Sequence, residues 1–112
     1  MPTINIERAP DRIKVRYKGA SKALRDLLYD IGQDLVKEVQ EFTPVGWTGL
    51  LNGAWYARRT RTGFELVNRT PYADIDSPKS WHKVDVFGLA LKATRKAITR
   101  NRKKIAKVIA NG

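Results

Sequence analysis

The sequence contains no cysteine, a single histidine and a single methionine among its 112 residues. Without cysteine the chain can form neither a disulfide framework nor a thiolate metal site, which fits an intracellular protein. It also lacks any run of ~18 apolar residues and any apolar signal core near its start, so we expect a soluble, unsecreted protein. With 42% hydrophobic residues, it is predicted to fold as one domain, residues 1–112, around a modest core.

Patterns that would support catalysis are scarce. The one histidine, His82, lies in the segment 71–86 together with Asp74, Asp76 and Asp85. These residues could be read as a metal site, or the first two aspartates as a carboxylate pair for acid/base work, but solvated loop residues are the simpler interpretation. There is no glycine-rich phosphate loop and no serine–histidine motif. We therefore expect neither an enzyme nor a cofactor.

Acidic residues are few and unevenly placed. The chain has 22 lysines and arginines against 11 acids, a formal charge of +11, and no acid follows Asp85. Between residues 19 and 42 acids outnumber bases by five to three. The overall surplus of bases favours contact with nucleic acid or with an acidic protein, and a solvated helix face is the plain alternative. A membrane is not expected as a partner, since the last helical turns lack aromatic anchors.

Alternation of apolar and polar residues predicts short strands with one buried face. Trp55 belongs to the apolar face of one of them, and Gly63 in the turn "TRTG" suits a positive φ. Gly63 and its neighbours should therefore join two strands in a hairpin. The predicted strands cover residues 3–7, 13–17, 50–59 and 64–68.

Apolar residues at helical spacing predict two long helices. The first is capped by Ser21 and should end near Thr43, because Pro44 disfavours helical geometry in the residue before it. The second runs from Gly88 to Ala110, and its apolar stripe weakens near Asn101, so its last two turns are expected to project from the body. Truncation at Asn101 should then leave a folded domain. The predicted class is α+β: a small antiparallel sheet of three or four strands on a long helix, with a second long, basic C-terminal helix.

Four short motifs follow one another along most of the chain: Thr43-Pro44-Val45, Thr48-Gly49-Leu50-Leu51, Asn68-Arg69-Thr70-Pro71-Tyr72-Ala73 and Phe87-Gly88-Leu89-Ala90-Leu91. In this order they resemble the tail-completion or neck family of tailed bacteriophages, which includes minor tail proteins of the lambda Z type. Gly46 and Trp47 stand where the family usually has one residue, often aspartate.

The resemblance implies a helix packed on a small antiparallel sheet and a structural role in the virion. Such proteins form a ring, here expected to hold six or twelve copies, at the junction between head and tail. They are made in the cytoplasm of the bacterial host and contact neighbouring connector, tail-terminator or tail-tube proteins. Nonspecific contact with packaged DNA is also expected. A free, nonspecific nucleic-acid-binding protein remains the alternative from a different class.

Two sets of candidate site residues follow. Large aromatic side chains beside glycines are typical of interface anchors. The expected subunit interface comprises Trp47, Thr48, Gly49, Leu50, Tyr72, Trp81 and Phe87. The acidic helix of one subunit is expected to face the basic helix of the next. The bases that could line a DNA channel or meet an acidic partner are Arg58, Arg59, Arg61 and Arg69 near the hairpin, and Arg95, Arg100, Arg102, Lys103, Lys104 and Lys107 on the C-terminal helix.

Overall fold

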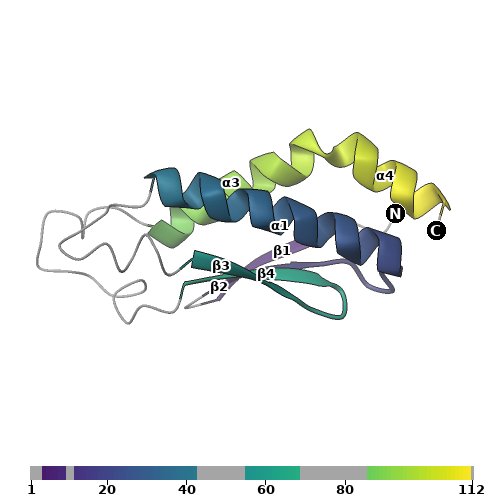
Figure 1. Ribbon diagram of the computed structural model, residues 1–112, viewed down its shortest axis with the longest axis horizontal. Coiled ribbons are helices and arrows are strands. Elements are labelled where there is room, and N and C mark those ends of the chain that lie inside the picture. Colours follow the sequence, from purple (N-terminus) through teal and green to yellow (C-terminus); the bar gives the residue numbers. More distant parts are fainter. Residues whose placement is uncertain (1–3, 10–11, 43–54, 69–85, 112) are drawn as a thin grey trace, which may run out of the picture.

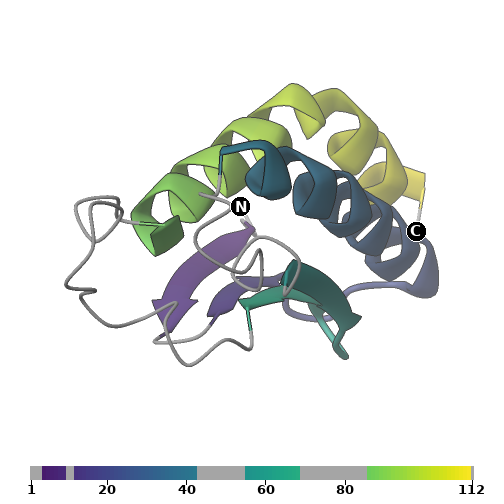
Figure 2. The same cartoon turned by 60° about the vertical axis from the view of Figure 1, so that its left-hand side comes forward.

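The protein folds as a four-stranded antiparallel sheet covered by helices, as the α+β prediction requires. The computed structural model describes residues 4–9, 12–42, 55–68 and 86–111. The helices of this part lie together on one side of the sheet (Figures 1 and 2). In chain order its elements are β1 (Asn5–Ala9), β2 (Arg12–Arg16), α1 (Lys22–Phe42), β3 (Trp55–Arg59), β4 (Gly63–Asn68), α3 (Val86–Arg100) and α4 (Arg102–Asn111).

The sheet has the strand order β1-β2-β4-β3. Register places Val15 opposite Phe64 and Ile13 opposite Leu66, so these four side chains share the face that the helices cover. Alternate residues of the same strands, such as Lys14 and its partner Glu65, point to the other face. The first predicted strand is shifted along the chain, because β1 continues through Arg8 and Ala9 where a turn was expected.

Helix α1 begins and ends close to the predicted positions. Leu24 donates its backbone N–H to the Ser21 hydroxyl at 3.2 Å, which is the expected N-terminal cap. The helical spacing of its apolar residues brings Leu24, Leu28, Leu35 and Val39 onto one buried stripe against the sheet. Trp55 completes this core, since it is buried and its ring meets that of Phe87 edge-on at 5.4 Å.

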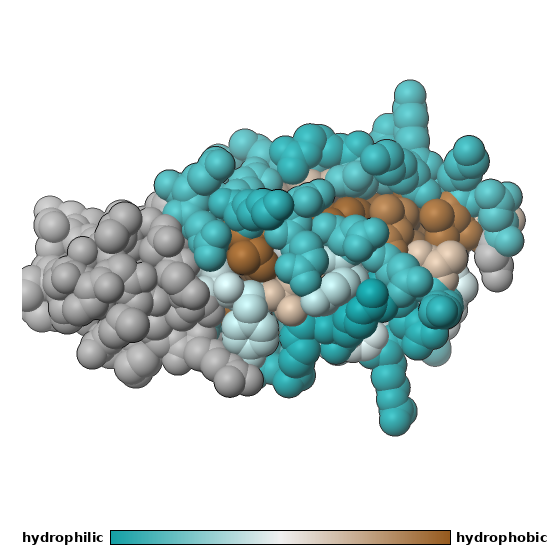
Figure 3. Space-filling model, in the orientation of Figure 1, coloured by the Kyte–Doolittle hydropathy of each residue, from teal (hydrophilic) through white to brown (hydrophobic). Residues whose placement is uncertain are grey.

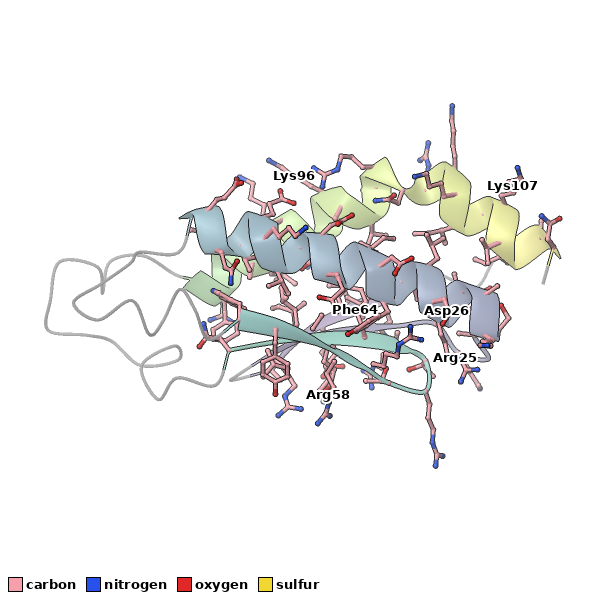
Figure 4. The ribbon with its side chains drawn as sticks, viewed as in Figure 1. Arg25, Asp26, Arg58, Phe64, Lys96 and Lys107 are labelled. Carbon is pink, nitrogen blue, oxygen red and sulfur yellow. The ribbon has the colours of Figure 1, made fainter. Side chains whose placement is uncertain are left out.

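One glycine allows α1 to lie very close to the sheet. A β-carbon placed on Gly32 would lie 2.7 Å from Cδ2 of Phe64, a distance that side chains do not tolerate. Phe64 is fully buried between α1 and β4 (Figure 4), so its ring has no free space into which it could move. A glycine in mid-helix normally costs stability, and here the close packing of helix on sheet offsets that cost.

The reason for glycine at position 63 differs from the predicted one. Among the described residues only Gly19 has a positive φ, at 73°, in the turn that closes with the Ala20 N–H donating to the Tyr17 carbonyl. Gly63 instead lies in β4, where a β-carbon would come within 2.2 Å of the Val15 carbonyl oxygen. Close approach of two backbones, and not a left-handed conformation, therefore requires glycine at this position.

The C-terminal helix was predicted as one continuous element, and this is wrong at Asn101. Asn101 separates α3 from α4, and its side-chain amide donates to the Ala97 carbonyl at 2.8 Å. A side chain that bonds the carbonyl four residues earlier is a known cause of helix bending. The bend returns α4 toward α1 (Figure 1), and Ile105 joins the shared core at 5% exposure. The last turns therefore pack against the body and do not project from it.

Candidate nucleic-acid interface

The outer side of α3 and α4 carries positive charge along its whole length. All eight lysines and arginines of these helices are exposed, and neither helix contains an acid. Figure 3 shows hydrophilic side chains over this side, and Figure 4 shows Lys96 and Lys107 pointing away from the sheet. We call this surface the basic helix face; it consists of Lys92, Arg95, Lys96, Arg100, Arg102, Lys103, Lys104 and Lys107.

The folding of the chain gives this surface its shape. The buried side of the two helices consists of small or apolar residues, including Ala90, Ala97 and Ile105, which pack toward α1 and the sheet. Because a helix repeats about every 3.6 residues, the bases between these positions must point outward. Within it, Arg95, Lys96, Thr99 and Arg100 line a shallow hollow. This arrangement offers several cationic donors to an extended anion and no enclosed pocket.

One edge of the basic helix face meets carboxylates of α1. Arg100 donates to Glu38 at 3.3 Å, and among the described residues it is the only base of this face with a carboxylate within ion-pair distance. Asp34, Arg100 and Lys104 line one groove between α1 and the bend at Asn101. The sequence suggested that the acidic helix faces the basic helix of the next subunit. In the folded chain Glu38 instead faces the basic helices of its own chain.

The arginines on the open face of the sheet are tied to carboxylates. Glu65, 8% exposed, accepts from Arg12 at 3.0 Å and from Arg58 at 2.7 Å. Arg16 pairs in the same way with Glu7 on the neighbouring strand. Positive charge on this face is therefore partly neutralised, and the guanidinium groups of Arg12, Arg16 and Arg58 already have carboxylate partners. Arg58, predicted as a DNA or partner contact, belongs to this network.

Arg59 links the hairpin to α1. Its guanidinium donates to Asp26 at 2.6 Å and lies over the ring of Tyr29, 4.4 Å from the ring centre. The hydrogen bond from Arg59 lowers the pKa of Asp26 below its usual value. Arg59 was predicted to contact DNA or a partner, but it faces the helices and joins β3 to α1. Arg61 is exposed in the turn that follows.

The Asp26–Arg59 pair predicts a specific pH dependence. Because the pKa of Asp26 is lower in the folded than in the unfolded chain, the pair contributes stability above pH ~4 and loses it as the pH falls through the folded pKa. Asp26→Asn should therefore lower the melting temperature at pH 6 and leave it unchanged near pH 2. Melting curves of both chains over this range would test it, and a gap that persists at pH 2 would contradict the assigned cause.

Most of the predicted subunit interface lies outside the described residues: Trp47, Thr48, Gly49, Leu50, Tyr72 and Trp81. The same holds for Arg69, His82 and the aspartates near it. Phe87 is described, and its role at a subunit interface stays a prediction. Its side chain is 1% exposed, packs against Trp55 and lies beneath the guanidinium of Arg8, 5.9 Å from the ring centre. Within the folded chain it is a core residue.

Several residues that shape the charged surfaces were missed by the sequence reasoning. Glu65 joins two arginines, and alternation along β4 could have placed it on the open face. The Glu38–Arg100 pair spans 62 positions, and no local pattern predicts such a contact. In the described ranges no group of histidines and acids could hold a metal ion. None of the helices described is long and apolar enough to cross a bilayer.

No family model, no curated protein and no solved structure matches this chain.

Proposed function

We propose that this protein is a structural subunit of the head–tail connector, or neck, of a tailed bacteriophage. In this proposal it completes the tail and joins it to the DNA-filled capsid as a homo-oligomeric ring of six or twelve copies. Its neighbours are connector and tail-terminator or tail-tube proteins, and it catalyses no reaction. It is made in the host cytoplasm and resides in the virion.

The observation that carries this proposal is where the family-like motifs fall in the fold. Thr43-Pro44-Val45 follows directly after α1, and the Asn68–Ala73 motif starts at the last residue of β4. The Phe87–Leu91 motif forms the first turns of α3, with Phe87 and Ala90 buried. The motifs thus lie at element boundaries, where the element order implied by the resemblance would place them. The order of helix, hairpin and basic helices also agrees with the expected family fold.

The basic helix face supports the same role. DNA passes through a phage neck, and a wall around it needs contacts that carry no sequence information. The exposed lysines and arginines of the basic helix face suit a channel lining of this kind, since contacts with phosphates hold DNA without selecting its sequence.

Location in the particle is the direct test. Mass spectrometry of purified phage should find the chain at a low copy number, and antibody labelling in electron micrographs should place it between head and tail. A phage that carries a stop codon in this gene should yield filled heads and separate tails. Mature, infectious particles without the chain would contradict the proposal.

A free nucleic-acid-binding protein is the second candidate function, and it is favoured by the same basic helix face, which contains no acidic residue. It would be absent from particles and would bind DNA strongly on its own. With six or more phosphate contacts, its affinity would fall about 10³-fold or more between ~50 and ~200 mM salt. A ring subunit should bind weakly as a free chain, because its grip comes from many copies around one duplex.

A further inference from the structure

Within the part of the chain that the structure describes, two separate basic surfaces lie on opposite sides. Arg58 projects from the open face of the sheet, whereas Lys96 and Lys107 project from the outer side of α3 and α4 (Figure 4). The sheet and a layer of helices lie between them, so one stiff duplex cannot touch both at once. One of the two surfaces must therefore be the better nucleic-acid contact.

The sheet surface is the weaker of the two. Its arginines already donate to carboxylates: Arg12 and Arg58 to Glu65, and Arg16 to Glu7. A phosphate would have to compete with these partners for every one of these guanidinium groups. On the basic helix face only Arg100, among the described residues, has such a competitor. Seven of the eight bases there can meet phosphates without breaking an ion pair inside the described part of the chain.

We infer that the basic helix face binds the phosphate backbone of duplex DNA, and that carboxylates of α1 weaken this binding: Glu38 competes for Arg100, and Asp34 adds negative charge to the groove that Arg100 and Lys104 line. This inference rests on the proposed function for its setting in a phage neck. The contact itself depends only on residues of α1, α3 and α4, so DNA binding and position in the virion can be tested separately.

Composition of the surface favours DNA over an acidic protein. Protein interfaces have apolar and aromatic centres from which charged residues are depleted. The exposed side of α3 and α4 has no aromatic residue, and Leu89 and Ile109, near its two ends, are the exposed large apolar residues of the described chain. Interfaces with DNA are instead polar and strongly positive. The surface thus has the chemistry of the second class.

Its dimensions also suit a duplex. At about 1.5 Å per residue, helices of 15 and 10 residues are roughly 22 and 15 Å long, close together to one turn of DNA. The bend at Asn101 makes the pair convex on the side away from the sheet (Figures 1 and 2). A straight duplex can therefore touch only part of the basic helix face at once, on the order of four phosphates. The expected slope of log K against log salt is then about −4.

The test measures fluorescence anisotropy of a labelled duplex of random sequence with the full chain between ~50 and ~200 mM salt. Lys96→Gln with Lys103→Gln removes two charges from the basic helix face, and should weaken binding about tenfold or more and reduce the slope by about 2. Lys18→Gln with Arg61→Gln removes the same charge from exposed positions elsewhere, and should change affinity less than about threefold. Lysine and glutamine have similar helix propensities, so the folds should persist, and circular dichroism verifies this.

The competing carboxylates have their own matched pair. Asp34→Asn with Glu38→Gln should tighten binding by about threefold or more, because Arg100 loses its carboxylate partner and Asp34 no longer adds negative charge to the groove that Arg100 and Lys104 line. Asp30→Asn with Glu41→Gln adds the same net charge on the same helix at exposed positions, and should have a smaller effect. Equal effects of the two pairs would show that net charge alone acts, and would overturn the competition.

Three results would overturn the DNA contact itself. They are no binding to duplex at ~50 mM salt, an equal loss of affinity in the Lys96/Lys103 and the Lys18/Arg61 double variants, and tighter binding to polyglutamate than to DNA. The last would identify an acidic protein as the partner. These results leave the position in the virion untouched, since a chain can be found in the neck without binding DNA. Conversely, if the chain binds DNA but is absent from phage particles, the proposed function in the neck is contradicted and the inferred DNA contact still holds.

Discussion

Replacing Phe64 with alanine is expected to lower the free energy of unfolding by about 3–5 kcal/mol, the usual cost of removing a buried aromatic ring. Phe64 is fully buried, and it fills the space between α1 and β4 where the helix lies closest to the sheet. The neighbouring helix and strands are held by their own packing and cannot collapse into the vacated volume. Urea unfolding followed by circular dichroism measures the change.

Two further variants assign this loss to the helix–sheet contact. Leu89→Ala removes an apolar side chain that is 40% exposed, and should change stability by no more than about 0.5 kcal/mol. Gly32→Ala should destabilise the chain by about 1–2 kcal/mol, because overpacking against Phe64 exceeds the gain in helix propensity. In a Phe64→Leu background the same change should be neutral or stabilising. An unchanged cost in that background would contradict the close contact.

Ile105→Ala is the second large effect, with an expected loss of about 2–5 kcal/mol. Ile105 is 5% exposed and belongs to the core that α4 shares with α1, although the sequence suggested a projecting helix end. Ile109 on the same helix is 37% exposed and provides the matched control. The chemical change is identical at the two sites, so the difference between the two losses of stability measures the effect of burial. Ile109→Ala should cost less than about 1 kcal/mol.

The same packing changes how the helix end should be probed in phage. Truncation at Asn101 would remove the buried Ile105 together with four bases of α4, so loss of head–tail joining would not distinguish charge from folding. Substitution of surface lysines keeps Ile105 in place and separates the two causes. Equal stabilities of Ile105→Ala and the unmodified chain would mean that α4 does not pack on the body, and would make truncation valid again.

The pattern of apolar and polar residues was sufficient to predict most helices and strands and the α+β fold class. Apolar residues at helical spacing placed α1 with its cap at Ser21, and alternation placed β4 and the buried Trp55. Both patterns are local, since each depends on which side of one element faces away from water. The break at Asn101 was visible only as a weaker stripe, and there the Asn101 side chain donates to the Ala97 carbonyl of the preceding turn.

The charge surplus and its concentration after residue 85 are properties of the sequence by itself, and they determined that a one-signed basic surface would exist. Only the tertiary structure decided which bases remain available to a partner. Arg12 reaches Glu65 and Arg59 reaches Asp26 across 53 and 33 positions, contacts that arise when separate elements are packed together. The physical reason is that ion pairing depends on distances of a few ångström in space, and these distances cannot be read from the separation of two residues along the chain.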